Sequence, residues 1–143
     1  MWNAIARCVG IASVLCRETG LITGLIGVHG SVSGFITVNM SERTAIKVVE
    51  GLLQESFGEL TTEVVDSAGE ITNITVGGIK SSLAGSPWAF FQITIPSVVV
   101  GKGYHIAYVK GLEFVCATFE YEDDGALMLE DRLMRVSVSL LRL

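Results

Sequence analysis

The stretch from Glu63 to Leu83, EVVDSAGEITNITVGGIKSSL, constrains the fold more than any other part of the chain. At about 100° per residue, five of its residues, four of them polar or charged, fall within an arc of about 80°. We call these five residues the acidic stripe: Glu63, Asp66, Glu70, Asn73 and Gly77. Apolar residues gather on the opposite side: Val64, Ala68, Ile71, Thr75 and Ile79, with Val65, Val76 and Leu83 at one flank. This separation predicts a long helix, capped by Thr61 or Thr62, with one buried face and one exposed face.

Two features of the acidic stripe are unusual for a helix face that only meets water. Asn73 is a poor helix former, because its side chain competes for backbone hydrogen bonds. Gly77 and Gly78 each cost about 1 kcal/mol relative to alanine in a helix interior. The simpler interpretation of the pattern alone is a solvated face with a kink or an end at the glycine pair. The alternative is a face that another molecule approaches closely.

The same stretch carries a family resemblance. DSAGEITNITVGGIKSSL resembles the signature of the CheX branch of the CheC/CheX/FliY group of chemotaxis phosphatases, whose motif Glu-x-x-Asn reads Glu70-Ile71-Thr72-Asn73 here. On one side, ITGLIGVHGSVSGFITVNMSERTAIKVVEGLL resembles the hairpin and first long helix of the family, and on the other ITIPSVVVGKG resembles its next strand and loop. The resemblance runs from about Ile22 to Glu130, and residues 1–20 resemble a shortened form of the leading segment.

The resemblance implies hydrolysis of the aspartyl-phosphate on the receiver domain of a response regulator, typically the chemotaxis regulator CheY. Asn73 and Glu70 would then be the catalytic residues. Asn73 would position the attacking water, since an amide offers both a donor and an acceptor, and Glu70 would pair with the lysine of the receiver. We add that Asp66 and Glu63 would be charges at the rim of the docking surface, and that Gly77 would leave room for receiver loops. The chain would bind no cofactor of its own, and Mg²⁺ would be held by the receiver.

The number of sites separates the branches of this group, because the CheC branch carries a second acidic-Asn pair. Asn39 lacks an acidic residue three positions earlier, where Ile36 stands, so we expect one site per chain. Proteins of the CheX branch are dimers joined through their sheets, which implies a homodimer. Two other interpretations stay open: a module that docks on a receiver without hydrolysing anything, and a purely structural dimer.

Segments typical of strands lie on both sides of two predicted helices. Strands are expected at residues 21–28 and 35–40, joined as a hairpin, and then at 89–100, 104–109, 112–121, 126–133 and 136–141. Ser41 is expected to cap the first helix, and Gly58 to end it. Residues 1–20 fit either a helical stripe (Trp2, Ile5, Ala6 and Val9) or a strand beginning at Gly10. This order predicts a single α+β domain over residues 1–143, with both helices on one face of a mostly antiparallel sheet.

Composition restricts the possible partners. A net charge of −5 argues against nucleic acid, whose binding depends on Lys and Arg. No apolar run reaches the ~18 residues of a membrane span, and the short run at residues 8–16 lacks the small-residue cleavage site of a signal peptide. Cys8, Cys16 and Cys116 match no zinc pattern, so we expect reduced, buried thiols and a cytoplasmic location.

Other chemical motifs are weak. Residues 101–103, Gly-Lys-Gly, could cradle a phosphate but lack the helix that should follow, so we interpret them as a loop between strands. Residues 122–124 could hold a cation, but a solvated turn is the simpler interpretation. We expect His105 to be structural and Trp88 to lie in the core or an interface.

Overall fold

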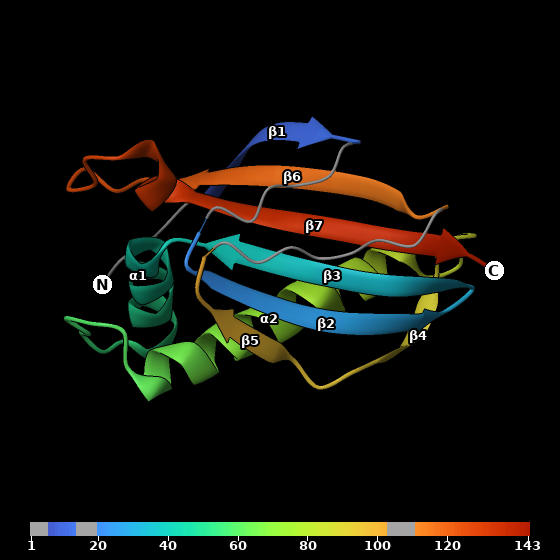
Figure 1. Ribbon diagram of the computed structural model, residues 1–143, viewed down its shortest axis with the longest axis horizontal. Coiled ribbons are helices and arrows are strands. Elements are labelled where there is room, and N and C mark those ends of the chain that lie inside the picture. The colour runs from blue at the N-terminus through green and yellow to red at the C-terminus, as the bar shows by residue number, and fades with distance from the viewer. Residues whose placement is uncertain (1–5, 14–19, 103–110) are drawn as a thin grey trace.

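The computed structural model of the protein describes residues 6–13, 20–102 and 111–143. Its strands form one antiparallel sheet in the order β1-β6-β7-β3-β2-β4, and β5 also pairs with β2. The strands are β1 Ala6–Ala12, β2 Ile22–Gly30, β3 Val32–Met40, β4 Phe90–Ile93, β5 Ser97–Val100, β6 Glu113–Tyr121 and β7 Leu133–Arg142. The helices are α1 Glu42–Leu53, α2 Thr62–Leu83 and the 3₁₀ helix η1 Leu129–Arg132. Figure 1 shows α2 crossing one face of the sheet and α1 at one end, which confirms the predicted α+β class.

The β2–β3 hairpin forms as predicted, but its strands are longer and its turn is tighter. Backbone pairing runs from Ile22 opposite Met40 to His29 opposite Ser33. Near the other end of β3, Asn39 is only 1% exposed. Its amide nitrogen donates to the carbonyl of Gly20 at 3.1 Å, and its amide oxygen accepts from the Gly20 N–H at 2.9 Å. These hydrogen bonds hold the start of β2 against β3, so Asn39 is structural, in keeping with the expectation that it is not a second site.

Helix α1 begins where the sequence predicts and ends earlier. The Ser41 hydroxyl accepts a hydrogen bond from the Thr44 N–H at 3.1 Å, which satisfies a first-turn donor. The helix ends at Leu53 because Gln54 takes a left-handed conformation, with φ of 60°. The predicted end at Gly58 is therefore wrong, and Gly58 lies in the connection to α2.

Helix α2 packs on the sheet through its apolar face. Val64, Ala68, Ile71 and Val76 are buried as predicted, whereas Thr75, Ile79, Val65 and Leu83 are only partly buried. Thr72, which the polar–apolar pattern did not assign to this face, is fully buried against β2. A Cβ at Gly24 of β2 would collide with the Thr72 side chain, so glycine at this position allows the close approach of α2 to the sheet.

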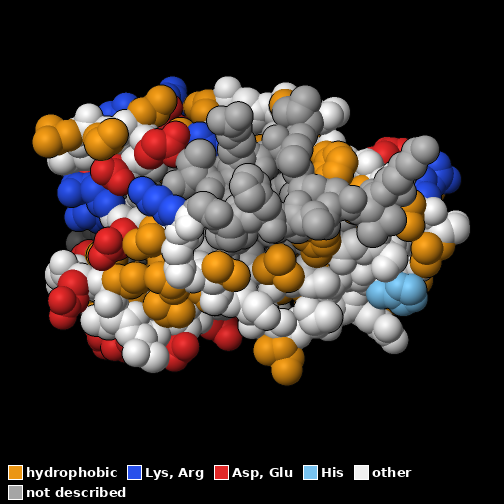
Figure 2. All heavy atoms as spheres, in the orientation of Figure 1, with side chains coloured by type: hydrophobic (Ala, Val, Ile, Leu, Met, Phe, Trp, Pro, Cys, Tyr) orange, Lys and Arg blue, Asp and Glu red, His pale blue; other side chains and the backbone are white. Residues whose placement is uncertain are grey.

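Two of the strands predicted after α2, at residues 89–100 and 126–133, are not formed as predicted. The segment 89–100 is divided into β4 and β5 by a connection at residues 94–96 that ends in Pro96, which has no N–H to donate to a sheet. Residues 126–133 do not form a strand; they form the β6–β7 connection and η1, and only Leu133 belongs to β7. Leu127 at the tip of this connection is 99% exposed, and Figure 2 shows hydrophobic side chains standing out there at the upper left.

Ion pairs hold the β6–β7 connection in place. The Arg43 guanidinium of α1 donates two hydrogen bonds to the Asp123 carboxylate, at 2.7 and 2.9 Å. Arg135 of β7 donates two more to Glu130, at 2.9 and 3.0 Å. Asp123 is thus not the solvated turn residue that the sequence suggested. Within the described residues no cluster of metal-ligating side chains is present, here or elsewhere.

The Arg43–Asp123 pair predicts a pH dependence of stability. Its hydrogen bonds lower the pKa of Asp123 below the ordinary carboxyl value. A carboxyl group whose folded pKa is depressed stabilises the fold above its unfolded pKa, and this contribution is lost as the pH falls through the folded pKa. We expect Asp123→Asn to lower the free energy of unfolding at neutral pH and to match the unmodified protein in acid.

Denaturant unfolding from neutral pH down to about pH 2 measures this difference. Asp124→Asn is the matched control, because Asp124 is exposed and has no ion pair with a described residue. A stability difference for Asp123→Asn that stays constant across this pH range would contradict the assignment.

The start of the described chain is a strand, and two cysteines differ from the sequence expectation. Residues 6–12 form β1 against β6, so the helical alternative is wrong for Ala6 and Val9. Cys8 is exposed and free, and Cys116 is buried but disulfide-bonded, so neither is the buried reduced thiol that was expected.

Trp88 packs against the core, and Arg142 lies over its ring at 5.3 Å from the ring centre.

Several sequence predictions fall outside the described residues. They concern Trp2, Ile5, Cys16, His105 and the strand at 104–109. Gly101 and Lys102 follow β5 as a loop, and Gly101 donates its N–H to the Leu21 carbonyl at 2.8 Å. No described helix is long and apolar enough to cross a membrane.

Candidate functional site

The acidic stripe is presented by a helix with a well-defined start. The Thr61 hydroxyl accepts from the Val64 N–H at 3.2 Å, and Glu63 lies in the first turn, where the helix dipole favours a carboxylate. The helix continues without interruption to Leu83. The glycine pair therefore neither ends nor splits the helix, and all five stripe positions lie on one continuous element.

The structure places the three carboxylates of the stripe on the solvent side. Glu63, Asp66 and Glu70 are exposed, and none of them forms an ion pair with a described basic residue. Figure 2 shows acidic side chains along the lower left edge, where the α1–α2 connection and the start of α2 lie. This face therefore carries negative charge that the described part of the chain does not neutralise.

Asn73 lies one helical turn after Glu70 and is partly exposed. Among the residues that the structure describes, no hydrogen-bond partner of its side chain is found. A partner molecule can therefore use both the donor and the acceptor of this amide. The Glu70–Asn73 pair is thus accessible to solvent, as predicted. On the opposite side of the helix Ile71 is buried as predicted, whereas Ile79 is only partly buried.

Gly77 and Gly78 form a bare stretch of helix one turn beyond Asn73. A Cβ added at either position would meet nothing within 4 Å. Packing within the described residues thus gives no reason for glycine here, although each glycine weakens the helix by about 1 kcal/mol. The same face also carries Ile74, which is 61% exposed. The polar pattern did not include Ile74, although the helical angle places it beside Glu70 and could have identified it.

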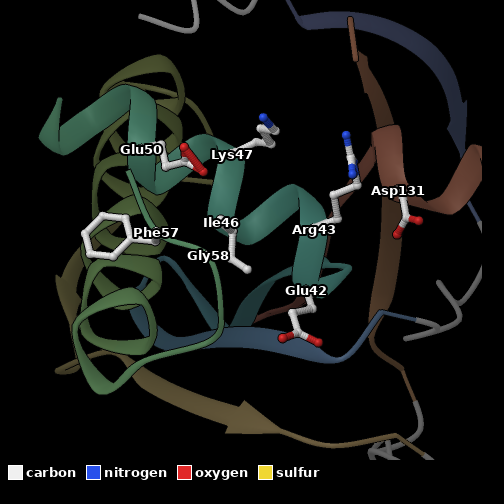
Figure 3. A pocket seen from close by; sticks show the side chains of 8 residues that line it. All are labelled: Glu42, Arg43, Ile46, Lys47, Glu50, Phe57, Gly58 and Asp131. Atoms are coloured by element: carbon white, nitrogen blue, oxygen red, sulfur yellow. The ribbon is translucent and has the colours of Figure 1, made fainter. Parts of the chain in front are cut away.

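Two hollows of the described surface lie elsewhere. One, of about 530 Å³, is lined by α1, the α1–α2 connection and η1. Figure 3 shows its charged side chains, among them Glu42, Lys47 and Glu50, spread along the wall rather than pointing to one centre. Arg43 in this wall is already paired with Asp123. A second hollow, between the end of α2 and strands β6 and β7, is almost entirely apolar. Neither hollow contains a residue of the acidic stripe.

The fold and the stripe together define a class of protein: a small α+β domain that presents a carboxylate and an amide one turn apart on an exposed helix face rather than in a cleft. The family model described as chemotaxis phosphatase CheX matches residues 22–120. The chain therefore belongs to the CheX family. No curated protein matches the sequence.

Solved structures agree with this assignment. CheX from Vibrio vulnificus is 26% identical, with a TM-score of 0.75, over 94% of this chain and 85% of that chain. A CheC-like chemotactic protein from Shewanella oneidensis is 21% identical, with a TM-score of 0.73, over 96% of this chain and 84% of that chain. The complex of CheX with CheY, BeF₃ and Mg²⁺ from Borrelia burgdorferi matches at 23% identity and a TM-score of 0.73, over 94% of this chain and 84% of that chain. The last two similarities concern the fold alone.

Proposed function

We propose that this protein hydrolyses the aspartyl-phosphate of a CheY-like receiver domain in chemotaxis or a related two-component pathway. One observation carries the proposal: Glu70 and Asn73 lie one turn apart on the exposed face of α2, unengaged by any described residue, inside the segment that matches the CheX family. The Borrelia burgdorferi relative was solved as a complex with CheY, BeF₃ and Mg²⁺, which supports a receiver as the partner.

The chemistry suits an amide and a carboxylate. Phosphoryl transfer needs an attacking water in line with the leaving oxygen and electrostatic stabilisation of the phosphoryl oxygens, but little covalent help. The receiver supplies the Mg²⁺ and the lysine beside its phosphoryl group. Asn73 would position the water, using its carbonyl oxygen as acceptor and its NH₂ group as donor. Glu70 would pair with the receiver lysine and so fix the register of docking.

The remaining stripe residues would shape the docking surface. Asp66 and Glu63 are exposed, so they would act at its rim and change the association rate more than the affinity. Gly77 would admit a receiver loop, since the space above it is open. A receiver as substrate implies that the protein works in the cytoplasm, and the chain itself would need no metal.

The decay of phosphorylated receivers with and without this protein tests the function. We expect at least one receiver from the same organism to lose its phosphoryl group faster when the protein is added. If receivers bind but decay at their own rates, and Glu70→Ala abolishes the binding, the protein is a docking module. If no receiver binds and no receiver decays faster, the protein is neither a phosphatase nor a docking module, and a structural role remains.

We also propose that the protein is a homodimer joined at the sheet edge formed by β1. All residues of β1 are exposed, Ile11 to 71%, and the described residues leave its outer edge unpaired. An exposed, apolar edge strand is a template for pairing with another strand. We expect light scattering to give the dimer mass at micromolar concentration and Ile11→Lys to shift the equilibrium to the monomer. A monomer for the unmodified protein at that concentration would rule out the dimer but leave the acidic stripe unaffected.

A further inference from the structure

Two large apolar side chains are exposed on α2 and on the connection that packs against it. Ile74 of α2 is 61% exposed, and Ile95 of the β4–β5 connection is 88% exposed. Single exposed hydrophobic residues are normal on protein surfaces. These two differ from a chance exposure in their position, because Ile74 is one helical turn after Glu70 and Ile95 precedes the proline that packs at Gly69, one turn before Asn73.

The β4–β5 connection is held against the rest of the molecule on both sides of Ile95. The Thr94 N–H donates to the Gly27 carbonyl at 2.9 Å, and the Gly27 N–H donates to the Thr94 hydroxyl at 2.9 Å. Pro96 lies against α2, since a Cβ at Gly69 would be 3.9 Å from its ring carbons. Figure 2 shows hydrophobic side chains standing out at the lower edge, where Figure 1 places this connection. The exposure of Ile95 is therefore set by the fold.

Helical spacing places Ile74 on one flank of the polar pair, and the contact of Pro96 with α2 places the β4–β5 connection on the other. Gly69 and Asn73 are four residues apart and share one flank of α2, so Pro96 lies on the Asn73 side, and from this we infer that Ile95, its neighbour in the chain, lies on that side too. Ile74 is four residues after Glu70 and about 100° around the helix from Asn73, so it borders the other side. The bare backbone at Gly77 and Gly78 adjoins Ile74 and leaves room for a partner side chain.

This arrangement has the composition of an interface centre. Binding hot spots are surrounded by contacts that exclude water. Excluding water around Glu70 would also strengthen its attraction to a positive charge, because the local dielectric constant falls. An acidic stripe without apolar neighbours would remain solvated and would bind more weakly.

We propose that Ile74 and Ile95 form an apolar bracket that docks the phosphorylated receiver and selects among receivers. This inference rests on the proposed function. The partner surface should therefore present apolar side chains on both sides of its phosphorylated aspartate. Receivers with polar side chains at these two places should be poor substrates.

Steady-state kinetics on a phosphorylated receiver that the unmodified protein dephosphorylates test the bracket. We expect Ile95→Ser and Ile74→Ala each to raise KM about 10-fold, a typical loss for an interface anchor, and to leave kcat unchanged. Ile95→Leu should restore most of the affinity. Leu127→Ser is the matched control, because Leu127 is 99% exposed on the β6–β7 connection and lies outside the bracket. Its kinetic constants should equal those of the unmodified protein.

The outcomes separate this inference from the proposed function. Unchanged KM values for Ile95→Ser and Ile74→Ala in an otherwise active protein would overturn the bracket alone. A lower kcat with unchanged KM would also overturn it, since the two residues would then act on the chemistry. Loss of dimerisation together with unchanged KM would assign these side chains to self-association instead. If the unmodified protein neither binds nor dephosphorylates any receiver, the proposed function and the bracket fall together.

Discussion

Asn73→Ala is expected to lower the rate of receiver dephosphorylation by about 10² to 10³-fold, because it removes the group that positions the attacking water. This corresponds to about 3 to 4 kcal/mol of transition-state stabilisation. Binding to a receiver loaded with beryllofluoride should be largely kept, since Glu70 and the apolar bracket remain. Single-turnover decay of the phosphorylated receiver and a binding titration measure the two quantities separately.

The control for this variant is Gln92→Ala, which removes an exposed amide from β4, outside the acidic stripe. Neither substitution should change stability by more than about 0.5 kcal/mol, because neither side chain is buried. An Asn73→Ala protein with full activity on a receiver that the unmodified protein dephosphorylates would disprove the water-positioning role.

Glu70→Ala is expected to weaken docking rather than the chemical step. The loss of a charge-assisted hydrogen bond to the receiver lysine should cost about 1 to 3 kcal/mol of binding free energy. The salt dependence of association should also decrease, since one attractive charge is gone. Calorimetric titration of the beryllofluoride-loaded receiver at two ionic strengths measures both effects.

Glu55→Ala is the matched control for charge, because Glu55 is an exposed carboxylate in the α1–α2 connection. It should bind the receiver as the unmodified protein does. Equal losses for Glu70→Ala and Glu55→Ala would show that only overall charge matters and would remove the specific role of Glu70.

The sequence predicted best where a local rule also decided the structure. The apolar period of residues 62–83 identified α2, and the threonine cap placed its start, because both signals depend only on neighbouring residues. The same period showed which side of α2 faces solvent. The exposed Glu70–Asn73 pair could therefore be located without coordinates.

The sequence predicted less well where distant residues compete with local preference. Residues 126–129 are an apolar run typical of a strand, but ion pairs of Asp123 before it and Glu130 after it hold this segment in a loop. One of them joins Arg43 to Asp123, residues that are 80 positions apart. The end of α1 was misplaced at Gly58 because Gln54, rather than a glycine, takes the left-handed conformation.

The apolar part of the proposed docking surface could not be predicted from neighbouring residues alone, because it also depends on contacts between distant residues. The β4–β5 connection that carries Ile95 lies on the Asn73 side of α2 only because β5 pairs with β2 and Pro96 packs at Gly69. Neither contact has a periodic signal in the sequence. A helical projection alone could have found Ile74, whereas Ile95 needed the sheet topology.

Multiple-turnover release of phosphate tests the central claim most directly. One equivalent of this protein is mixed with a large excess of a continuously phosphorylated receiver, and free phosphate is followed with time. If α2 presents a catalytic pair, phosphate should be released in many equivalents per protein, at a rate proportional to protein concentration, and Asn73→Ala should remove this acceleration. Release at the rate of the receiver alone, for every receiver that binds, would contradict the account.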